Sequence, residues 1–176
     1  MKTHDYKGHT ITITVHHDEN MGPPWEEHDG HGIVSEWVRR DKRPGELVLI
    51  TERGASRFYD VEATFKIASR DGWGLGDEAL AKLASKLGRK PTHRQVIAAA
   101  VQSDFEYLRG WCRDEWQWLG FTTEIETPAK QIVEGFSCWG FDDEDYMIRE
   151  AIGEAKATVD KMILTEEETL KAEAMP

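Results

Sequence analysis

HTITITVHH, residues 9–17, alternates apolar and polar residues along most of its length. Ile11, Ile13 and Val15 fall on one side of an extended chain, and threonines fall on the other. This period of two predicts a β-strand with one buried face. Such a strand requires partner strands beside it and a covering layer over its apolar side.

Two other stretches are predicted to form β-hairpins that would supply those partners. Residues 46–61 hold two β-rich runs on either side of Gly54, which readily adopts the positive φ of a tight turn. Residues 116–139 hold two more runs around Pro128, which suits a turn because it has no N–H to donate to a ladder. Strands joined by hairpins rather than by helical crossovers predict an antiparallel sheet.

Helix-start signals predict three helices in the middle of the chain. Asp60 and Asp77 are good N-cap residues, and each precedes a short amphipathic segment. Thr92 and Gln95 have the spacing of a capping box, and they open a long central helix predicted over residues 92–115. Apolar residues recur every three or four positions in this helix, which predicts one buried stripe.

A C-terminal helix is predicted over residues 143–163, where acidic residues crowd the first turn and favour the positive end of the helix dipole. Its apolar residues recur every three or four positions from Ile148 to Ile163, which predicts one buried face. These patterns together predict the α+β class, with a mostly antiparallel sheet of about five strands packed by the central and C-terminal helices. The length of the chain suits a single domain, expected over residues 1–164. Residues 165–176 form an acidic tail with almost nothing to bury, and we expect it to fray.

The net charge of −11 is unevenly distributed along the sequence. Residues 1–103 hold 15 acidic and 15 basic residues, whereas residues 104–176 hold 18 acidic and 7 basic residues. Nucleic-acid binding relies on neutralising phosphates, so the C-terminal part is expected to repel DNA and RNA. The same charge predicts attraction to basic surfaces on other proteins.

Composition also indicates the compartment. No apolar run reaches the roughly 20 residues that span a bilayer. The first residues, MKTHDYKGHT, lack the apolar core of a signal peptide. Two cysteines do not make a disulfide framework. We therefore expect a cytoplasmic protein without a membrane segment.

The histidine-rich stretch HHDENMGPPWEEHDGHG, residues 16–32, is open to three interpretations. It is a surface loop pinned to the core by Trp25, or a loop that docks a partner through Trp25, or a metal site. A site for zinc or another divalent metal would need at least three ligands and an open position for water. The candidate ligands are His17, Asp18, His28, Asp29 and His31.

A cluster of basic residues surrounds the turn before the central helix, and no acidic residue occurs between positions 79 and 103. Its members are Lys82, Lys86, Arg89, Lys90 and Arg94. Such a patch would hold phosphate or nucleic acid, or it would balance the acidic half of the molecule.

Residue patterns for catalysis are scarce. The serines lack a G-x-S-x-G elbow, and neither a P-loop nor a G-x-G-x-x-G fingerprint is present. Cys112 falls on the predicted buried stripe and is expected to be an inert core thiol. Trp111, Trp116, Trp118 and Trp139 are expected to form a core cluster rather than a base-stacking surface. These features favour a binding protein over an enzyme.

Several strings resemble small, hypothetical proteins of tailed bacteriophages and prophages, over most of residues 9–155. They are MGPPWEEHDGHG, RPGELVL, RGASRFYDVEATFKIASRDGWG, YLRGWCRDEW and CWGFDDEDY. The resemblance implies a phage accessory gene expressed in the cytoplasm of a bacterial host. It implies no activity and no catalytic residues.

The leading hypothesis is a non-catalytic protein that binds a basic surface of host or phage origin. In this setting it would inhibit a host-defence or nucleic-acid-processing complex, with carboxylates spaced like DNA phosphates. The candidate carboxylates are Asp142, Asp143, Glu144, Asp145, Glu150 and Glu154. A metal-dependent hydrolase or nuclease that uses the histidine-rich loop, and a nucleic-acid-associated protein that uses the basic patch, remain open alternatives.

Overall fold

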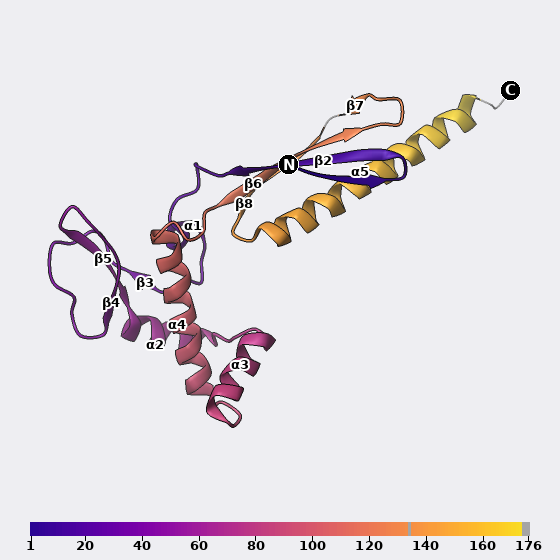
Figure 1. The fold of residues 1–176 in the computed structure, drawn as a ribbon. Helices are drawn as coiled ribbons and strands as arrows, with labels where there is room; N and C mark the ends of the chain where they lie inside the picture. The colour runs from indigo at the N-terminus through magenta and orange to yellow at the C-terminus, as the bar shows by residue number, and fades with distance from the viewer. Residues whose placement is uncertain (134, 174–176) are drawn as a thin grey trace. The chain divides into compact units, whose positions relative to one another are not determined.

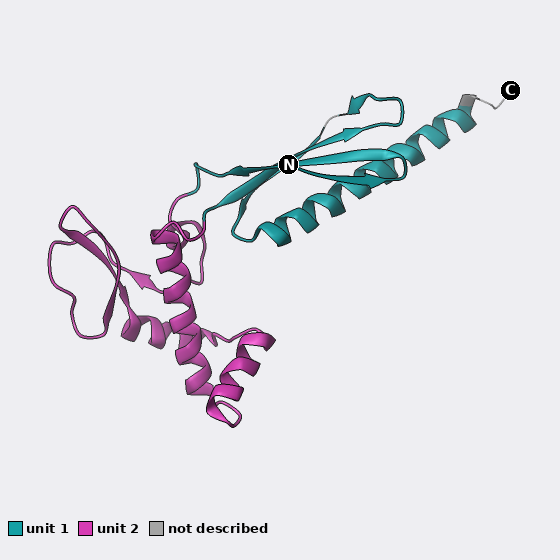
Figure 2. Cartoon of the chain, viewed as in Figure 1, with its two compact units in different colours: residues 1–21, 117–176 teal, residues 22–116 magenta. Residues whose placement is uncertain are grey.

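The computed structural model describes residues 1–133 and 135–173, and it divides the chain into two compact units (Figure 2). Unit 1 consists of residues 1–21 and 117–176, and unit 2 of residues 22–116. Each unit has its own hydrophobic core. The sequence predicted a single domain over residues 1–164. The structure differs because the segment between two neighbouring strands of unit 1 folds around a core of its own.

Unit 1 contains a five-stranded antiparallel sheet that includes the predicted strand 9–17 (Figure 1). Its strands are β1 (Lys2–Tyr6), β2 (His9–His17), β6 (Leu119–Glu126), β7 (Ile132–Val133) and β8 (Ser137–Phe141). β2 lies between β1 and β6, and β6 pairs with both β7 and β8. The β2–β6 register runs from Thr10 opposite Glu126 to His17 opposite Leu119, which places the apolar residues of both strands on one face.

That apolar face is covered by α5 (Glu144–Glu173), the C-terminal helix (Figure 1). The two elements bury a core of nine residues: Ile11, Ile13, Phe121, Ile125, Met147, Ile148, Ala151, Ala155 and Val159. The alternation in β2 and the three-to-four spacing in α5 therefore predicted the right faces. Burial of this apolar surface is the main stabilising contribution in unit 1, at roughly 25 cal/mol per Å².

Unit 2 packs four helices and a separate three-stranded antiparallel sheet, ordered β3-β5-β4 (Figure 1). Its elements are α1 (Pro24–Glu27), β3 (Ile33–Val34), β4 (Glu46–Glu52), β5 (Ala55–Asp60), α2 (Val61–Asp71), α3 (Asp77–Leu87) and α4 (His93–Cys112). The predicted stripe of α4 is buried at Ile97, Val101, Phe105 and Leu108. It packs against residues of α2 and the sheet, including the fully buried Tyr59.

The α+β class and the main helices are confirmed, whereas some boundaries and pairings differ. The hairpin predicted over 46–61 lies in the sheet of unit 2, and only the hairpin over 116–139 joins the predicted strand. β1 was not predicted, because its residues KTHDY are mostly polar. Asp77 is the first residue of α3 rather than its N-cap, which is Gly76.

The predicted tail also differs from the structure as far as the described residues extend. α5 continues to Glu173 rather than ending near 163, although residues 164–172 are exposed. Extending an existing helix costs far less than starting one, so the packed part of α5 supports the exposed turns. Residues 174–176 lie outside the described residues.

Arg40 and Glu46 form a two-pronged ion pair at the start of β4. The guanidinium donates to both carboxylate oxygens at 2.7 Å, and the N–H of Arg43 donates to one of them at 2.7 Å. The Arg40 guanidinium, and next the Arg43 N–H, lower the pKa of Glu46 from 4.5 to about 2. A carboxylate with a lowered pKa stabilises the fold above its unfolded pKa, and this contribution disappears as the pH falls through its folded pKa.

We expect Glu46→Gln to lower the melting temperature at pH 7, because the amide cannot form the charged pair. The difference from the wild type should shrink between pH 4.5 and pH 2, where the wild-type carboxylate becomes protonated. Thermal melts of both proteins at a series of pH values measure this. An unchanged difference at pH 2 would show that the effect is not electrostatic.

Candidate functional site

The net negative charge of the chain is concentrated in unit 1. Unit 1 contains 17 acidic and 7 basic residues, a net charge of −10, whereas unit 2 contains 16 acidic and 15 basic residues. Half of the chain therefore carries nearly all of the charge imbalance. A basic partner would be attracted to unit 1 far more than to unit 2.

Acidic side chains gather at the start of α5. Asp143 caps the helix, and its carboxylate accepts a hydrogen bond from the N–H of Tyr146 at 2.6 Å. Glu144 pairs with Lys2 at 3.0 Å, and both side chains are about half exposed. Asp142 and Asp145 are exposed. The helix dipole favours carboxylates here, so their exposure at this end of α5 costs the fold little.

The row of acids does not continue along the whole helix. Glu150 and Glu154 are exposed one turn apart, but the charges beyond them are mixed. Asp160 is held by Lys7 at 2.8 Å, which lowers the pKa of its carboxyl group, and Lys156 lies over the ring of Tyr6. We define the acidic surface as the six residues Asp142, Asp143, Glu144, Asp145, Glu150 and Glu154.

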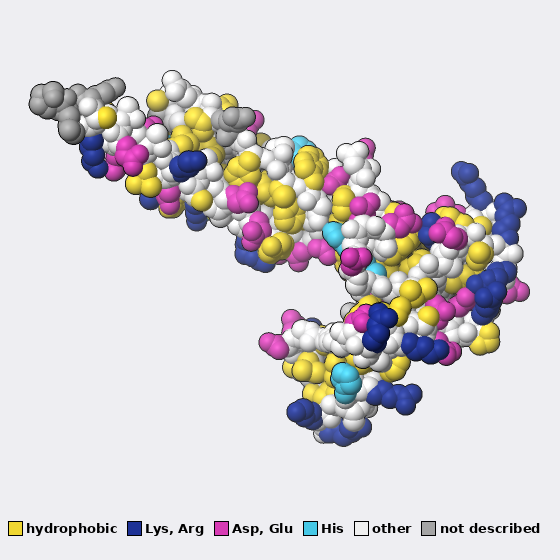
Figure 3. Space-filling view, turned by 180° about the vertical axis from the view of Figure 1, so that it is seen from behind, with side chains coloured by type: hydrophobic (Ala, Val, Ile, Leu, Met, Phe, Trp, Pro, Cys, Tyr) yellow, Lys and Arg dark blue, Asp and Glu magenta, His cyan; other side chains and the backbone are white. Residues whose placement is uncertain are grey.

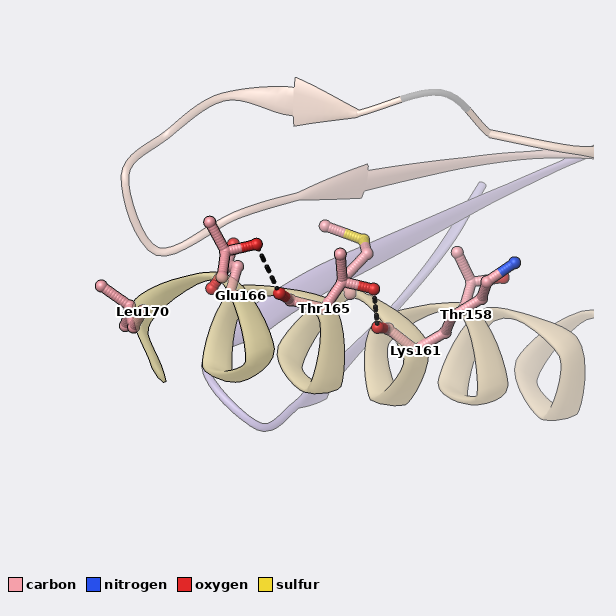
Figure 4. Close-up of a pocket in the computed structure, with 7 residues that line it drawn as sticks. Thr158, Lys161, Thr165, Glu166 and Leu170 are labelled. Atoms are coloured by element: carbon pink, nitrogen blue, oxygen red, sulfur yellow. Dashed lines mark hydrogen bonds between the residues drawn. The ribbon is translucent and has the colours of Figure 1, made fainter. Parts of the chain in front are cut away.

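A hollow of about 640 Å³ follows the C-terminal half of α5 (Figure 4). The threonine hydroxyls of this region donate to their own helix, Thr165 to Lys161 O at 2.9 Å and Thr169 to Thr165 O at 2.9 Å. Lys161 and Glu166 are the ionisable residues of the lining. Among the described residues of this lining, no nucleophile is paired with a base.

The histidine-rich loop is fixed to α4 through a carboxylate that sequence reasoning missed. Asp104 accepts a hydrogen bond from His31 Nδ1 at 2.7 Å, and its other oxygen accepts from Gly32 N–H and from the Tyr59 hydroxyl, both at 2.8 Å. The His31 ring also stacks on Tyr107, with ring centroids 5.5 Å apart. Burial, and next the Asp104 carboxylate, raise the pKa of Tyr59, so the phenol stays protonated and donates.

Gly32 is required by this arrangement, because a Cβ at that position would collide with the Tyr59 ring. The only hint in the sequence was that Asp104 stands next to the predicted buried stripe of the central helix. Nothing local pointed to a residue 73 positions away from His31.

The five candidate metal ligands are not brought together. In the described part of the chain, no group of three or more His, Cys, Asp or Glu side chains is placed to hold a metal ion. His17 and Asp18 belong to unit 1, and Asp18 accepts from Asn20 N–H at 3.2 Å. His28 and Asp29 lie at the exposed end of α1, whereas His31 turns to Asp104. Hydrogen bonds engage two of the five candidate ligands, Asp18 through Asn20 and His31 through Asp104.

Trp25 anchors the loop rather than presenting a free contact. It packs against the core of unit 2, with its ring edge-on to Trp111 at 5.6 Å. The Arg57 guanidinium lies over Trp25 at 5.5 Å and over Trp37 at 5.4 Å. The structure thus favours the interpretation of residues 16–32 as a pinned surface loop.

The basic patch is exposed at the end of unit 2 where α3 meets α4, and Figure 3 shows basic side chains around this end. Lys82 pairs with Glu78 at 2.7 Å, and the Arg94 guanidinium lies over the Phe65 ring at 5.9 Å. Lys90 lines a hollow of about 670 Å³ whose other walls include Leu80 and Val96. Phosphate binding at this patch remains a prediction.

The predicted tryptophan cluster is divided between the two units. Trp111 and Trp116 belong to unit 2, where the Trp116 indole N–H donates to Tyr107 O at 2.9 Å. Trp118 and Trp139 belong to unit 1, where Trp118 is buried and Trp139 is 47% exposed. Trp139 was therefore wrongly expected in a core cluster, because its indole is about half exposed and belongs to neither hydrophobic core.

Comparison with known proteins assigns no family to this fold. No protein-family model, curated protein or solved structure matches the chain. Among the described residues, no helix combines the length and apolar character needed to cross a membrane.

Replacing Asp104 tests the attachment of the histidine-rich loop. We expect Asp104→Ala to lower the free energy of unfolding by about 3 kcal/mol, because it leaves the Gly32 N–H and the His31 ring without their acceptor and removes one of the two acceptors of the Tyr59 hydroxyl. Amide exchange of residues 28–33 should become faster at the same time. Asp29→Ala, an exposed change in the same loop, is the control and should have an effect within about 0.5 kcal/mol. Unchanged exchange in Asp104→Ala would contradict the assignment.

The two free thiols should differ in reactivity. Burial raises the pKa of Cys112 to about 11, whereas Cys138 is exposed. Because the thiolate is the reacting species, a thiol reagent at pH 8 should label Cys138 quickly and Cys112 slowly, by more than about tenfold. Cys138→Ser should remove the fast phase and leave the slow one. Two equally fast phases in the wild type would place Cys112 at the surface.

Proposed function

We propose that this chain is a non-catalytic binding protein that engages a basic surface of another protein through the acidic surface of unit 1. The observation that carries the proposal is the concentration of charge, −10 on unit 1 against −1 on unit 2. Attraction of this kind speeds encounter and selects basic partners over acidic ones.

The arrangement of the acidic surface supports binding rather than catalysis. Its carboxylates are exposed on a helix that is itself packed on a sheet, so the surface is presented on a rigid element. Asp143 is used for capping and Glu144 is paired with Lys2, which leaves Asp145, Glu150 and Glu154 facing solvent. Glu150 and Glu154 are four residues apart on α5, so one basic surface can meet both of them on the same side of the helix.

The biological setting is part of the proposal and rests on the resemblance to small phage proteins. In that setting the partner would be a nucleic-acid-binding or host-defence complex in the bacterial cytoplasm, because such complexes expose basic surfaces. The chain would occupy such a surface and exclude its natural ligand. The mixed charges of α5 beyond Glu154 favour a compact contact over imitation of a long run of DNA phosphates.

Association with nucleic acid through the basic patch of unit 2 is the second candidate function. All five of its basic side chains are exposed, and in the described chain only Lys82 forms an ion pair. A gel-shift assay with mixed DNA and RNA tests it. A shift that is lost when Lys86, Arg89 and Lys90 are changed to Glu would favour this candidate over the leading proposal.

Charge reversal tests the acidic surface. We expect Asp142→Lys with Asp145→Lys to weaken capture of partners from a bacterial lysate by at least about tenfold at low salt. Reversed charges would repel the basic surface, and wild-type capture should also weaken as salt rises. Quantitative mass spectrometry of the captured proteins measures this.

Two further variants make the result specific. Glu150→Lys with Glu154→Lys reverses charge in the middle of α5, where no cap is disturbed, and should weaken the same partner. Asp29→Lys with Glu36→Lys makes an equal charge change on exposed residues of unit 2 and should leave capture intact. Equal loss in all three variants would show that net charge alone is responsible, and no loss in the first two would refute the proposal.

A further inference from the structure

Among the exposed large apolar side chains of unit 1, Trp139 lies on the face of the sheet opposite α5. Trp139 of β8 is 47% exposed, and it pairs across the sheet with Gly120 of β6. Its indole lies against Gly120 in the space that a side chain would fill, since a Cβ there would overlap the six-membered ring. The missing side chain at position 120 thus seats the indole on the sheet.

We call the Trp139 indole, seated on Gly120, the aromatic platform. His16 is its polar neighbour. The His16 ring lies 5.7 Å from the Trp139 ring with an angle of 34° between them, and its Nε2 is 3.0 Å from the Thr122 hydroxyl oxygen. One side of the indole is therefore covered by the sheet and one edge by His16. The exposed remainder is an aromatic surface of the kind on which planar groups stack.

Trp139 differs from Tyr6 and Tyr146, two other aromatic side chains of its unit that are at least partly accessible. Tyr6 carries Lys7 and Lys156 over its ring, and Tyr146 carries Arg149. No lysine or arginine of the described chain lies over Trp139 in this way. The aromatic face with the greatest affinity for a cation is thus left without one.

The electrostatic surroundings of Trp139 favour the binding of a cationic group from another molecule. Trp139 precedes Asp142 by three residues, at most about 11 Å along the chain. A hollow of about 540 Å³ lies along the same strands and is lined by residues that include Thr122, Glu124 and Ser137. Glu124 is exposed and has no ion pair within the described residues.

The spacing of these groups suits an extended peptide. Gly120, under the platform, and Glu124 are four residues apart on β6, about 13 Å along a strand. Side chains four residues apart in an extended peptide have the same separation. Two cations so spaced would reach the indole and the Glu124 carboxylate together.

We propose that Trp139, seated on Gly120, is the binding site for an arginine side chain of the basic partner. This inference rests on the proposed function, and it adds an aromatic anchor to the acidic surface. Arginine fits better than lysine, because its planar, weakly hydrated guanidinium stacks on a flat indole. A phosphate or nucleic-acid ligand is disfavoured by the net charge of unit 1.

The test titrates the full-length, ¹⁵N-labelled protein with the peptide acetyl-Gly-Arg-Gly-Gly-Gly-Arg-Gly-amide at low salt, with the indole N–H signals followed by NMR. We expect the indole N–H signal of Trp139 to shift until it saturates. This signal is assigned as the one that is missing from the spectrum of Trp139→Phe. Trp139→Ala should weaken binding about two- to fivefold, the value of an exposed cation–π contact. A peptide with lysine in place of arginine should bind more weakly, and one with glutamine should not bind.

A variant at Gly120 tests whether binding requires the position of the Trp139 indole on the sheet and not only its presence. Gly120→Ala displaces the ring without removing it and should weaken binding as Trp139→Ala does. Gly153→Ala, on α5 with no atom near the added methyl group, is the matched control and should bind as the wild type does. Thermal melts confirm that each variant is folded.

The possible outcomes distinguish failure of the arginine site at Trp139 from failure of the acidic surface. If Trp139→Ala binds like the wild type while Asp142→Lys with Asp145→Lys does not bind, the anchor is wrong and the acidic surface stands. If the wild type fails to bind the arginine peptide, the arginine anchor is contradicted, and the acidic surface is judged by the capture experiment alone. If the Trp139 signal moves with maltohexaose but not with the peptide, the platform binds neutral sugar and the arginine assignment is overturned.

Discussion

The antiparallel pairing of β2 with β6 is the constraint on which the rest of the structure depends. It joins residues 10–17 to residues 119–126, about a hundred positions later in the chain. The pairing continues past the end of β2, where Asp18 N–H donates to Trp118 O at 2.8 Å. Because the two strands are neighbours, the segment between them must begin and end close together. That requirement makes unit 2 an insertion with its own core rather than an extension of the sheet.

The same topology separates charge. Unit 1 is assembled from the first strands and the last third of the chain, and it collects the acidic C-terminal residues around one sheet and one helix. Unit 2 retains a nearly balanced set of charges, with its basic side chains exposed where α3 meets α4. In the sequence, the net negative charge appears only as an excess of acidic residues toward the C-terminus. In the structure, the same charge distinguishes unit 1 from unit 2. The proposed binding role and its aromatic anchor both follow from this property.

Local patterns predicted local structure well. The alternation in residues 9–17, the capping box of Thr92 with Gln95 and the cap of Asp60 are all present, the last with a hydrogen bond of 2.8 Å to Ala63 N–H. These signals depend on residues within a few positions of one another, so the sequence contains them completely. The partner of His31 is remote, at Asp104, and no spacing rule connects the two residues. Gly120 and Trp139 both lie in the predicted hairpin over 116–139, but their pairing depends on a strand register, with an irregularity next to Gly120, that the sequence pattern does not set.

The sequence by itself determined the α+β class, the faces that α4 and α5 bury, and the excess of acidic residues near the C-terminus. Only the tertiary structure decided that there are two cores, that His31 binds a carboxylate instead of converging with other metal ligands, and that Trp139 lies open on a sheet. The physical reason is the range of the forces involved. Periodicity and capping act over one or two turns, whereas strand pairing and side-chain packing join residues whose separation along the chain carries no signal.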